Sequence, residues 1–366
     1  MEAARAAWVQ AGRWKNPEVE LRAENLHFRA PIAGVQPSLD FFATLTQWIE
    51  IGGKPRLRQI VALADQERAA AEREKVELEL RLSALAFYFA ALRSHAEEVA
   101  LRGGERELQR LGAIAQRRAA EGHSPAAEFL KLESERGRLA AQRSEIETDK
   151  LRALEALRLL LGRSEPLAAE QLVEPPLIEP PGEPASELIE AAVQHHPDVR
   201  LRQAGQARAK GQLALERARQ LPDPAITAGY KRTESTDTWV TAITVPLPVF
   251  DTNRANVQRA LAEQHAAAAE LSAIEVQLRT ELMQLLYRSR ELYQRAQRLP
   301  QDLLQPATGV LHAARMAFEE GRGDLLALVD ATRVHTEAQR AVGSARLEAA
   351  ATAYTWKLLT EKTLTP

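Results

Sequence analysis

The second half of this chain repeats the first half in order, and this duplication restricts the possible fold more than any other feature. Arg254 follows Arg56 by 198 positions, and Gly321 follows Gly122 by 199 positions. A single inserted residue therefore keeps the two halves in register between these pairs. A chance likeness of two helices rich in Ala, Glu, Arg and Leu is the weaker explanation, because the turns and strand ends align as well.

Each half is predicted to hold two short strands followed by two long helices. After Pro55, apolar residues such as Val76, Leu80 and Phe87 recur at helical spacing. In the first repeat, residues 1–173, we expect strands at about 17–26 and 40–50 and helices at about 55–121 and 125–162. In the second repeat, residues 185–366, we expect strands at about 224–233 and 238–248 and helices at about 252–320 and 324–362.

Proline and glycine mark the interruptions in this plan. Residues 174–184, EPPLIEPPGEP, form a connector that cannot be a regular helix. Gly103-Gly104 in the first repeat and Pro300 with Pro306 in the second are expected to bend the long helices. The second repeat begins with a helix of about 184–220 that has only a short counterpart in residues 1–15. We therefore expect a truncated N-terminus that has lost its signal peptide.

The strands alternate between apolar and polar side chains. In the first strand Val19 and Leu21 alternate with Glu18, Glu20 and Arg22. This pattern suits a strand with one face toward lipid and one toward water, and strands of about nine residues can cross a bilayer when tilted. Four strands cannot close such a barrel alone, so spanning strands would require an oligomer. A small soluble sheet that caps a helical bundle remains the alternative.

Composition excludes several classes of function. The chain has 48 basic and 50 acidic residues, a net charge of −2, so no global field favours nucleic acid. It has no cysteine, and no apolar run approaches the ~18 residues of a membrane-spanning helix. No phosphate-binding loop, nucleophile elbow or acid/base pair is present, and we expect neither an enzyme nor a cofactor. His195 and His196 are adjacent and lack further ligands, so no metal site is predicted.

The order of these motifs resembles the TolC family of outer-membrane efflux proteins. The resemblance rests on "LTQWIEIGGKPR" at the end of the second strand, "ITVPLPVFDTNR" at the same place in the second repeat, and "AFEEGRGDLLALVDATR" at the last helical turn. The form Gln-x-Ile-Glu-x-Gly-Gly-Lys is most similar to members that serve heavy-metal cation efflux, the Czc/Cus type. The resemblance covers essentially the whole chain from Trp8 onward.

The resemblance implies a mainly α fold with four β-strands, in which three copies form a 12-stranded barrel continuous with an α-helical tunnel. It also implies an outer-membrane location in a Gram-negative bacterium with a large periplasmic part. The chain would be a passive exit duct, supplied by an inner-membrane pump and a periplasmic adaptor protein, with outer-membrane lipid around it. A soluble coiled-coil scaffold with a small β cap, or a duct of the same fold for organic molecules or secreted proteins, are the alternatives.

The family pattern also suggests where functional residues lie. The helical turns would form the periplasmic tip of the tunnel, and the carboxylate of Asp330 would narrow the pore there. The second acidic position typical of the family is Ala327 here, and Asp330 on a solvated helix surface is the alternative reading. The turn residues are Gly122, Ser124, Pro125, Gly321, Gly323 and Asp324, and the strand-to-helix junctions hold Gly52, Gly53, Pro55, Pro246, Pro248 and Asp251.

Overall fold

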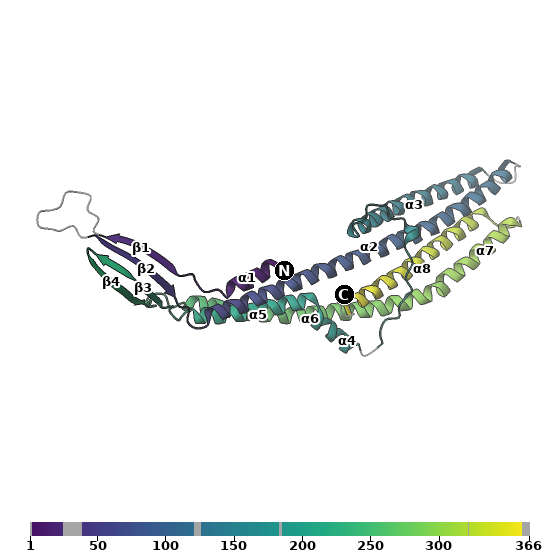
Figure 1. Cartoon of the computed structure of the whole chain (residues 1–366). Coiled ribbons are helices and arrows are strands. Elements are labelled where there is room, and N and C mark those ends of the chain that lie inside the picture. Colours follow the sequence, from purple (N-terminus) through teal and green to yellow (C-terminus); the bar gives the residue numbers. More distant parts are fainter. Residues whose placement is uncertain (1, 25–38, 121–125, 183–184, 321, 361–366) are drawn as a thin grey trace. The chain divides into compact units, whose positions relative to one another are not determined.

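The computed structural model describes residues 2–24, 39–120, 126–182, 185–320 and 322–360. Its internal contacts divide the chain into two units. Figure 1 shows the helices and strands, coloured along the sequence. The first unit comprises Met1–Lys75 and His196–Val276, and the second comprises Val76–His195 and Gln277–Pro366. Each unit therefore combines segments from both sequence repeats.

The first unit holds four strands in one antiparallel sheet of order β1-β2-β3-β4. They are β1 (Glu18–Glu24), β2 (Asp40–Trp48), β3 (Ala225–Thr233) and β4 (Thr236–Thr244). The two central strands, β2 and β3, come from different repeats, so the sheet joins the two halves of the sequence. A Cβ added at Gly229 of β3 would lie 2.4 Å from the Ala43 carbonyl oxygen, so the strands approach closely because this residue is glycine.

The register of the sheet separates apolar from polar side chains. Leu21 lies opposite Ala43, and Tyr230 lies opposite Trp239 in the same row. Since opposed residues share a face and successive residues alternate, the alternation predicted for β1 extends across all four strands. The apolar face carries Val19, Leu21, Phe41, Leu45, Ile226, Trp239 and Ile243.

The opposite face of the sheet is polar. The hydroxyl groups of Thr46 and Thr227 lie 2.9 Å apart across β2 and β3, and Lys231 pairs with Asp40 at 3.4 Å. On the apolar face Val19 is 71% exposed and Trp239 is 83% exposed within the single chain. The chain alone therefore leaves the apolar face of the sheet without a covering layer in its described residues.

Helices accompany the sheet in the first unit: α1 (Glu2–Ala11), α5 (Pro197–Ala218) and the first turns of α2 (Lys54–Ala120) and α6 (Arg254–Leu299). Small residues allow α5 to approach α2 closely, since a Cβ at Gly211 would already lie 3.1 Å from Val61. Arg208 of α5 also pairs with Asp65 of α2 at 2.8 Å, although both side chains are about half exposed and such a pair contributes little.

The second unit is helical. It contains the remaining parts of α2 and α6, together with α3 (Ala126–Leu160), a 3-10 helix (Ala169–Gln171), α4 (Ser186–His195), a π-helix (Pro300–Leu304), α7 (Gln305–Glu319) and α8 (Leu325–Thr360). A buried ion pair ties α3 to α2, because Lys150 lies 2.5 Å from Glu98, which is 1% exposed. No described helix is long and apolar enough to cross a bilayer.

Two predicted helices are divided in the structure. The helix expected over 252–320 is interrupted by the π-helix that begins at Pro300, because proline has no N–H for the α-helical ladder and one wider turn accommodates the gap. The helix expected over 184–220 breaks at His196, whose backbone is extended at φ −65° and ψ 134°. A proline disfavours the α conformation of the residue before it, here His196, and Pro197 is the first residue of α5.

A bend of α2 was expected at Gly103-Gly104, and the structure shows a packing role for Gly104 there. Helix α2 stays α-helical through both glycines. A Cβ on Gly104 would lie 2.7 Å from the Thr336 hydroxyl of α8 and 3.1 Å from Leu139 of α3. Gly104 therefore serves close packing between helices, and this purpose is not visible in the sequence of α2 alone.

Candidate functional site

Those junction, turn and gate residues singled out in the sequence that the structure describes lie in two regions, one in each unit. The first region is where strands become helices, and it belongs to the first unit. The second region is the turn between α7 and α8 with the helix ends around it, and it belongs to the second unit.

Two glycines make the turn from β2 into α2. Gly52 and Gly53 have φ values of +74° and +70°, a left-handed conformation that side chains with a Cβ resist. Pro55 lies in the first turn of α2, where its fixed φ suits the helix and its missing N–H costs nothing. The turn is also packed, because a Cβ on Gly52 would lie 3.0 Å from Leu221.

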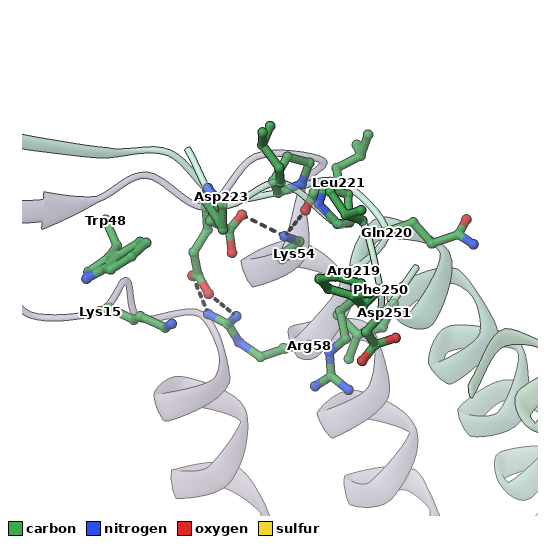
Figure 2. A pocket seen from close by; sticks show the side chains of 17 residues that line it. Lys15, Trp48, Lys54, Arg58, Arg219, Gln220, Leu221, Asp223, Phe250 and Asp251 are labelled. Atoms are coloured by element: carbon green, nitrogen blue, oxygen red, sulfur yellow. Dashed lines mark hydrogen bonds and ion pairs between the residues drawn. The ribbon is translucent and has the colours of Figure 1, made fainter. Parts of the chain in front are cut away.

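A buried lysine anchors this first junction. Lys54, the first residue of α2, is 6% exposed and donates to Asp223 Oδ1 at 2.6 Å and to the Leu221 carbonyl at 2.7 Å (Figure 2). Asp223 also accepts from the Ile51 backbone N–H at 3.0 Å. Asp223 thereby joins the end of β2, the start of α2 and the chain just before β3.

A second ion pair lies beside the first. Arg58 donates to both carboxylate oxygens of Glu50, at 2.6 and 2.8 Å, and also to the carbonyls of Ala11 and Arg13. The Glu50 side chain is only 4% exposed. The hydrogen bonds from Arg58 hold the pKa of Glu50 below its usual value, because they stabilise the ionised carboxylate more than burial destabilises it.

The junction from β4 into α6 uses other residues. Pro246 and Pro248 lie in the segment after β4, and the Asp251 carboxylate accepts from the Asn253 backbone N–H at 2.9 Å. Asn253 has φ +57° and directly precedes α6, as Gly53 directly precedes α2. Asparagine tolerates this conformation better than most residues do. Asn253 was not among the predicted junction residues, although the sequence Asp-x-Asn before a helix indicates an Asx turn.

A buried carboxylate of α5 holds this second junction. Glu216 is 2% exposed, and the Asn253 side-chain amide donates to its carboxylate at 2.9 Å and to its backbone carbonyl at 2.8 Å. Arg219 and Gln212 donate to the same carboxylate at 2.6 and 2.8 Å. The sequence offered no signal for Glu216, because it is one of many glutamates on a charged helix.

The two junctions border one cavity of about 670 Å³. Lys15, Trp48 and Arg219 lie around it in Figure 2, together with the Lys54 and Arg58 ion pairs. The chain segment after β4 lines another side and is unusually apolar and exposed, with Leu247 at 76% and Phe250 at 103% of full exposure. In the single chain this segment has no apolar cover among the described residues.

The turn between α7 and α8 closes tightly. The backbone N–H groups of Arg322 and Gly323 both donate to the Ala317 carbonyl, at 2.9 and 2.8 Å. A Cβ on Gly323 would lie 2.7 Å from the Phe318 nitrogen, so the turn needs glycine there. Asp324 caps α8, since its carboxylate accepts from the Leu326 N–H at 3.2 Å. The remaining turn candidates, Gly122, Ser124, Pro125 and Gly321, lie outside the described residues.

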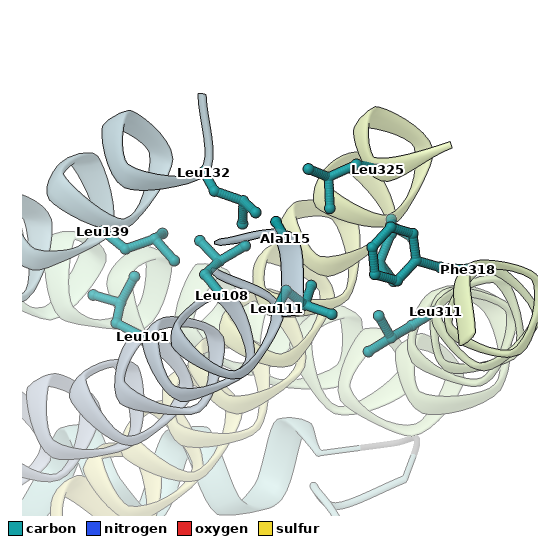
Figure 3. Packing of buried hydrophobic residues seen from close by; sticks show 11 residues of the cluster. Leu101, Leu108, Leu111, Ala115, Leu132, Leu139, Leu311, Phe318 and Leu325 are labelled. Carbon is teal, nitrogen blue, oxygen red and sulfur yellow. The ribbon is translucent and has the colours of Figure 1, made fainter. Parts of the chain in front are cut away.

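An apolar cluster packs the helix ends next to this turn. Phe318 of α7 and Leu325 of α8 face Leu111 and Ala115 of α2 (Figure 3). Leu111 is fully buried, and Leu325 is 3% exposed. Ion pairs lie alongside, including Arg315 with Glu107 at 2.6 Å. The turn is therefore fixed to α2 by both apolar and charged contacts.

Asp330 lies on the surface of α8, one turn and a half beyond its start. Its side chain is 62% exposed, and Arg333 on the same helix pairs with it at 2.5 Å. The hydrogen bond to Asp330 raises the pKa of Arg333 above its usual value. The prediction that Asp330 narrows the pore did not consider Arg333, which is a counterion on the same helical face. Lys131, the position that matches Asp330 in the first repeat, is exposed.

His195 and His196 make hydrogen bonds to the backbone at the break between α4 and α5. The ring of His196 accepts a hydrogen bond from the Asp198 backbone N–H at 3.2 Å and caps α5, and His195 contacts the Ala191 carbonyl at 2.8 Å. Among the described residues, no three side chains of His, Asp or Glu gather as a metal ion would require.

Comparison with known families accounts for this combination of sheet, junctions and helical turn. The family model of outer membrane efflux proteins matches residues 1–163 and 188–357. The chain belongs to the outer membrane efflux protein family. The expectation of a TolC-like outer-membrane protein is thus confirmed, and so is the expectation that the chain is an efflux channel and not an enzyme.

Individual relatives of this efflux protein agree with the family match. It is 28% identical over 334 residues to CzcC of Cupriavidus metallidurans, a cobalt-zinc-cadmium resistance protein, across 90% of this chain and 77% of CzcC. The outer membrane protein VceC of Vibrio cholerae has the same fold, with a TM-score of 0.78 and 18% identity over 98% of this chain and 90% of VceC. CusC gives a TM-score of 0.79 with 16% identity, over 98% of this chain and 85% of CusC.

These comparisons support the predicted fold class, which is mainly helical with four antiparallel strands. The structure itself explains the junction motif. Within Gln-x-Ile-Glu-x-Gly-Gly-Lys, the glycines make the left-handed turn, and Glu50 and Lys54 are the two buried charges that hold it. The motif thus records how a strand is joined to a helix.

Proposed function

We propose that this efflux protein is the outer-membrane exit duct of a tripartite system that exports heavy-metal cations. The observation that carries the proposal is the similarity to the cobalt-zinc-cadmium resistance protein CzcC, which extends over 90% of the chain. In this role the chain is passive. An inner-membrane pump supplies the energy and selects the substrate, and a periplasmic adaptor protein connects pump and duct.

The sheet supports a duct built from three copies of the chain. In the described residues β1 pairs only with β2, and β4 pairs only with β3, so each outer strand has one edge without a partner. Unpaired strand edges are costly in lipid, and a closed barrel removes them. Three sheets of four strands would give the twelve-stranded barrel, with exposed residues such as Val19 and Trp239 facing outer-membrane lipid.

The turn between α7 and α8 is the candidate contact for the adaptor and the place where the duct narrows. Asp330 supports this assignment, because its carboxylate is exposed and lies near the turn. Its counterion Arg333 partly neutralises it, and only one acidic position is present, since residue 327 is alanine. We therefore propose that Asp330 contributes a modest local preference for cations and does not form a tight binding site.

Metal tolerance of a deletion strain tests the proposed substrate. A strain that lacks this gene should grow to lower limits of Co²⁺, Zn²⁺ or Cd²⁺ than its parent, and the chain supplied from a plasmid should restore the limits. Growth limits for organic compounds serve as the comparison. Unchanged metal tolerance together with increased sensitivity to organic compounds would contradict cation export and favour the same duct with an organic cargo.

Two measurements test the assembly and the gate. Chemical crosslinking of outer membranes should yield a trimer, and a product that stops at the dimer would contradict the three-copy duct.

In reconstituted trimers, Asp330→Ala should alter conductance or its block by divalent cations, whereas the matched change Asp302→Ala, on the π-helix, should not. Equal conductance and equal block in the wild type and Asp330→Ala would remove Asp330 from the gate.

A further inference from the structure

A second cavity, distinct from the one at the junctions, lies entirely within the second unit. It is a groove of about 750 Å³ between α2, the chain from the end of α3 to Pro175, and the end of α8. Small-molecule sites in proteins usually have volumes of about 300–1,000 Å³ and are mainly apolar. The size of this groove is therefore that of a site for one small ligand.

The floor of the groove is apolar and well ordered by ring contacts. Phe89 of α2 is 5% exposed and packs edge-on against Tyr88, with ring centroids 5.7 Å apart. It also packs at a tilt against Tyr354 of α8, at 6.0 Å. The Tyr88 hydroxyl donates to the Val173 carbonyl, which fixes the chain segment along one side. Leucines complete the floor, including Leu157, which is 4% exposed.

The rim of the groove is positively charged. Arg81, Arg163 and Lys357 all line it, and none of the described residues that line it is acidic. Arg81 pairs with Glu77 at 2.5 Å, and both side chains are about half exposed; Arg163 lies 4.0 Å from Glu165, whose side chain is 84% exposed. Exposed pairs of this kind contribute little, so the two arginines can turn toward an incoming anion at small cost.

The combination of floor and rim restricts the ligand. Among the described lining residues a metal cation would meet three positive side chains and no carboxylate, so the groove does not suit the exported ion. A neutral apolar molecule would leave the charged rim unused. An amphiphile with one acyl chain and an anionic head uses both, because the acyl chain leaves water for the apolar floor and the head lies among the cations.

We propose that this groove binds a single-chain anionic amphiphile of the long-chain fatty acid class. The acyl chain lies along Leu85, Phe89 and Leu157, and the carboxylate faces Arg81 and Lys357. Because the ligand contacts α2, α8 and the segment that follows α3, its binding holds these three elements together. The site is separate from the strand-to-helix junctions, and its occupation does not depend on which cargo the duct exports.

Photolabelling tests this proposal directly. The full-length protein in phosphatidylcholine nanodiscs is incubated with palmitic acid that carries a diazirine, irradiated and digested, and the labelled peptides are identified by mass spectrometry. We expect label on peptides that contain residues 81–89, 157–172 or 354–358. Free palmitate should compete, whereas its methyl ester, which lacks the charge, should compete at least about fivefold less well.

Variants separate the charged rim from the apolar floor. Arg81→Gln combined with Lys357→Gln should reduce groove labelling about fivefold, since two exposed ionic contacts are lost. Ala84→Phe, which fills the partly exposed side of the groove, should abolish the labelling. The control Arg288→Gln removes an exposed, glutamate-paired arginine outside the groove and should leave labelling unchanged.

Several results would overturn the proposal. Equal competition by the acid and its methyl ester would show that the cations do not recognise the head. Equal losses in Arg288→Gln and in the rim variant would show a non-specific charge effect. A groove without label in the assembled wild type, whether because it is empty or because a neighbouring copy of the chain covers it, would also contradict it.

Discussion

The two strand-to-helix junctions occupy equivalent places in the repeats, yet they are stabilised differently. The first has two glycines at positive φ and two buried ion pairs, Lys54 with Asp223 and Glu50 with Arg58. The second has an asparagine at positive φ, which is bonded to a buried glutamate of α5, and an exposed apolar segment. Duplication thus preserved the geometry of the turn, while the residues that stabilise it diverged.

The two junctions differ in which residues provide the backbone conformation and which provide the side-chain contacts. At the first junction the backbone is free to turn because of glycine, and the charges then fix the turn. At the second junction one residue, Asn253, provides both the backbone conformation and the hydrogen bonds to Glu216. Substitutions that separate these two contributions should therefore affect the junctions unequally.

The largest effect is expected at the Lys54–Asp223 pair. Asp223→Ala leaves the Lys54 ammonium buried without its carboxylate and the Ile51 N–H without an acceptor. Breaking one partner of a buried pair costs about 3–5 kcal/mol of unfolding free energy. Guanidinium unfolding of the detergent-solubilised protein, followed by circular dichroism, measures this loss.

The matched substitution at the second junction is Asp251→Ala. It removes one hydrogen bond to the Asn253 backbone from an exposed side chain, so the loss should be clearly smaller. Equal losses for Asp223→Ala and Asp251→Ala would mean that the buried pair does not distinguish the first junction from the second.

Glu216 should give the next largest effect. Glu216→Ala removes the acceptor of Asn253, Gln212 and Arg219 at once, and we expect a loss of about 2 kcal/mol in unfolding free energy, measured in the same titration. Glu216→Gln keeps one acceptor oxygen and should lose less. If the two variants lost the same amount, the charge of Glu216 and not its hydrogen bonds would hold the junction.

The backbone conformation before each helix should contribute less. Gly53 has φ +70° with no other atom within 4 Å of an added Cβ, so Gly53→Ala tests the backbone alone. The left-handed conformation costs roughly 1–2 kcal/mol for a residue such as alanine. Gly53→Asn is the matched control and should be less destabilising, since Asn253 occupies the same conformation at the other junction. An asparagine that destabilised as much as alanine would contradict this equivalence.

Sequence reasoning was strongest where a local rule fixes the backbone. It located the four strands, the glycine pair and the Asp324 turn, because alternation, positive φ and helix capping are each visible in a few neighbouring residues. It failed where a partner is distant in sequence. Lys54 and Asp223 are 169 positions apart, and Glu216 meets Asn253 across 37 positions, so their burial depends on packing that no short motif records.

The same limit explains the remaining differences. The sequence predicts a bend at Gly104, because the residues of α3 and α8 that pack against it are distant in sequence. Arg333 lies three positions after Asp330, at a spacing that favours an ion pair on one helix, so this contact was predictable from the sequence. The π-helix at Pro300 was expected only as an interruption, since proline predicts the break and tertiary packing decides how the break is accommodated.

The smallest expected effect concerns the charge of Glu50, which has no counterpart at the second junction. Its pKa is lowered in the folded protein, chiefly by the hydrogen bonds from Arg58, while the nearby carboxylate of Asp223 opposes the shift and Lys15 assists it. A lowered folded pKa gives stability that is present above the unfolded value, about 4.5, and is lost as the pH falls through the folded value.

The wild type should therefore exceed Glu50→Gln in unfolding free energy by a constant amount between about pH 6 and pH 7, and this advantage should shrink below about pH 4.5. Guanidinium titrations of both proteins across this range measure the difference. If the difference stayed constant down to the lowest pH at which the protein folds, the ion pair with Arg58 would hold Glu50 by geometry alone, and the two junctions would differ less in their electrostatics than their residues indicate.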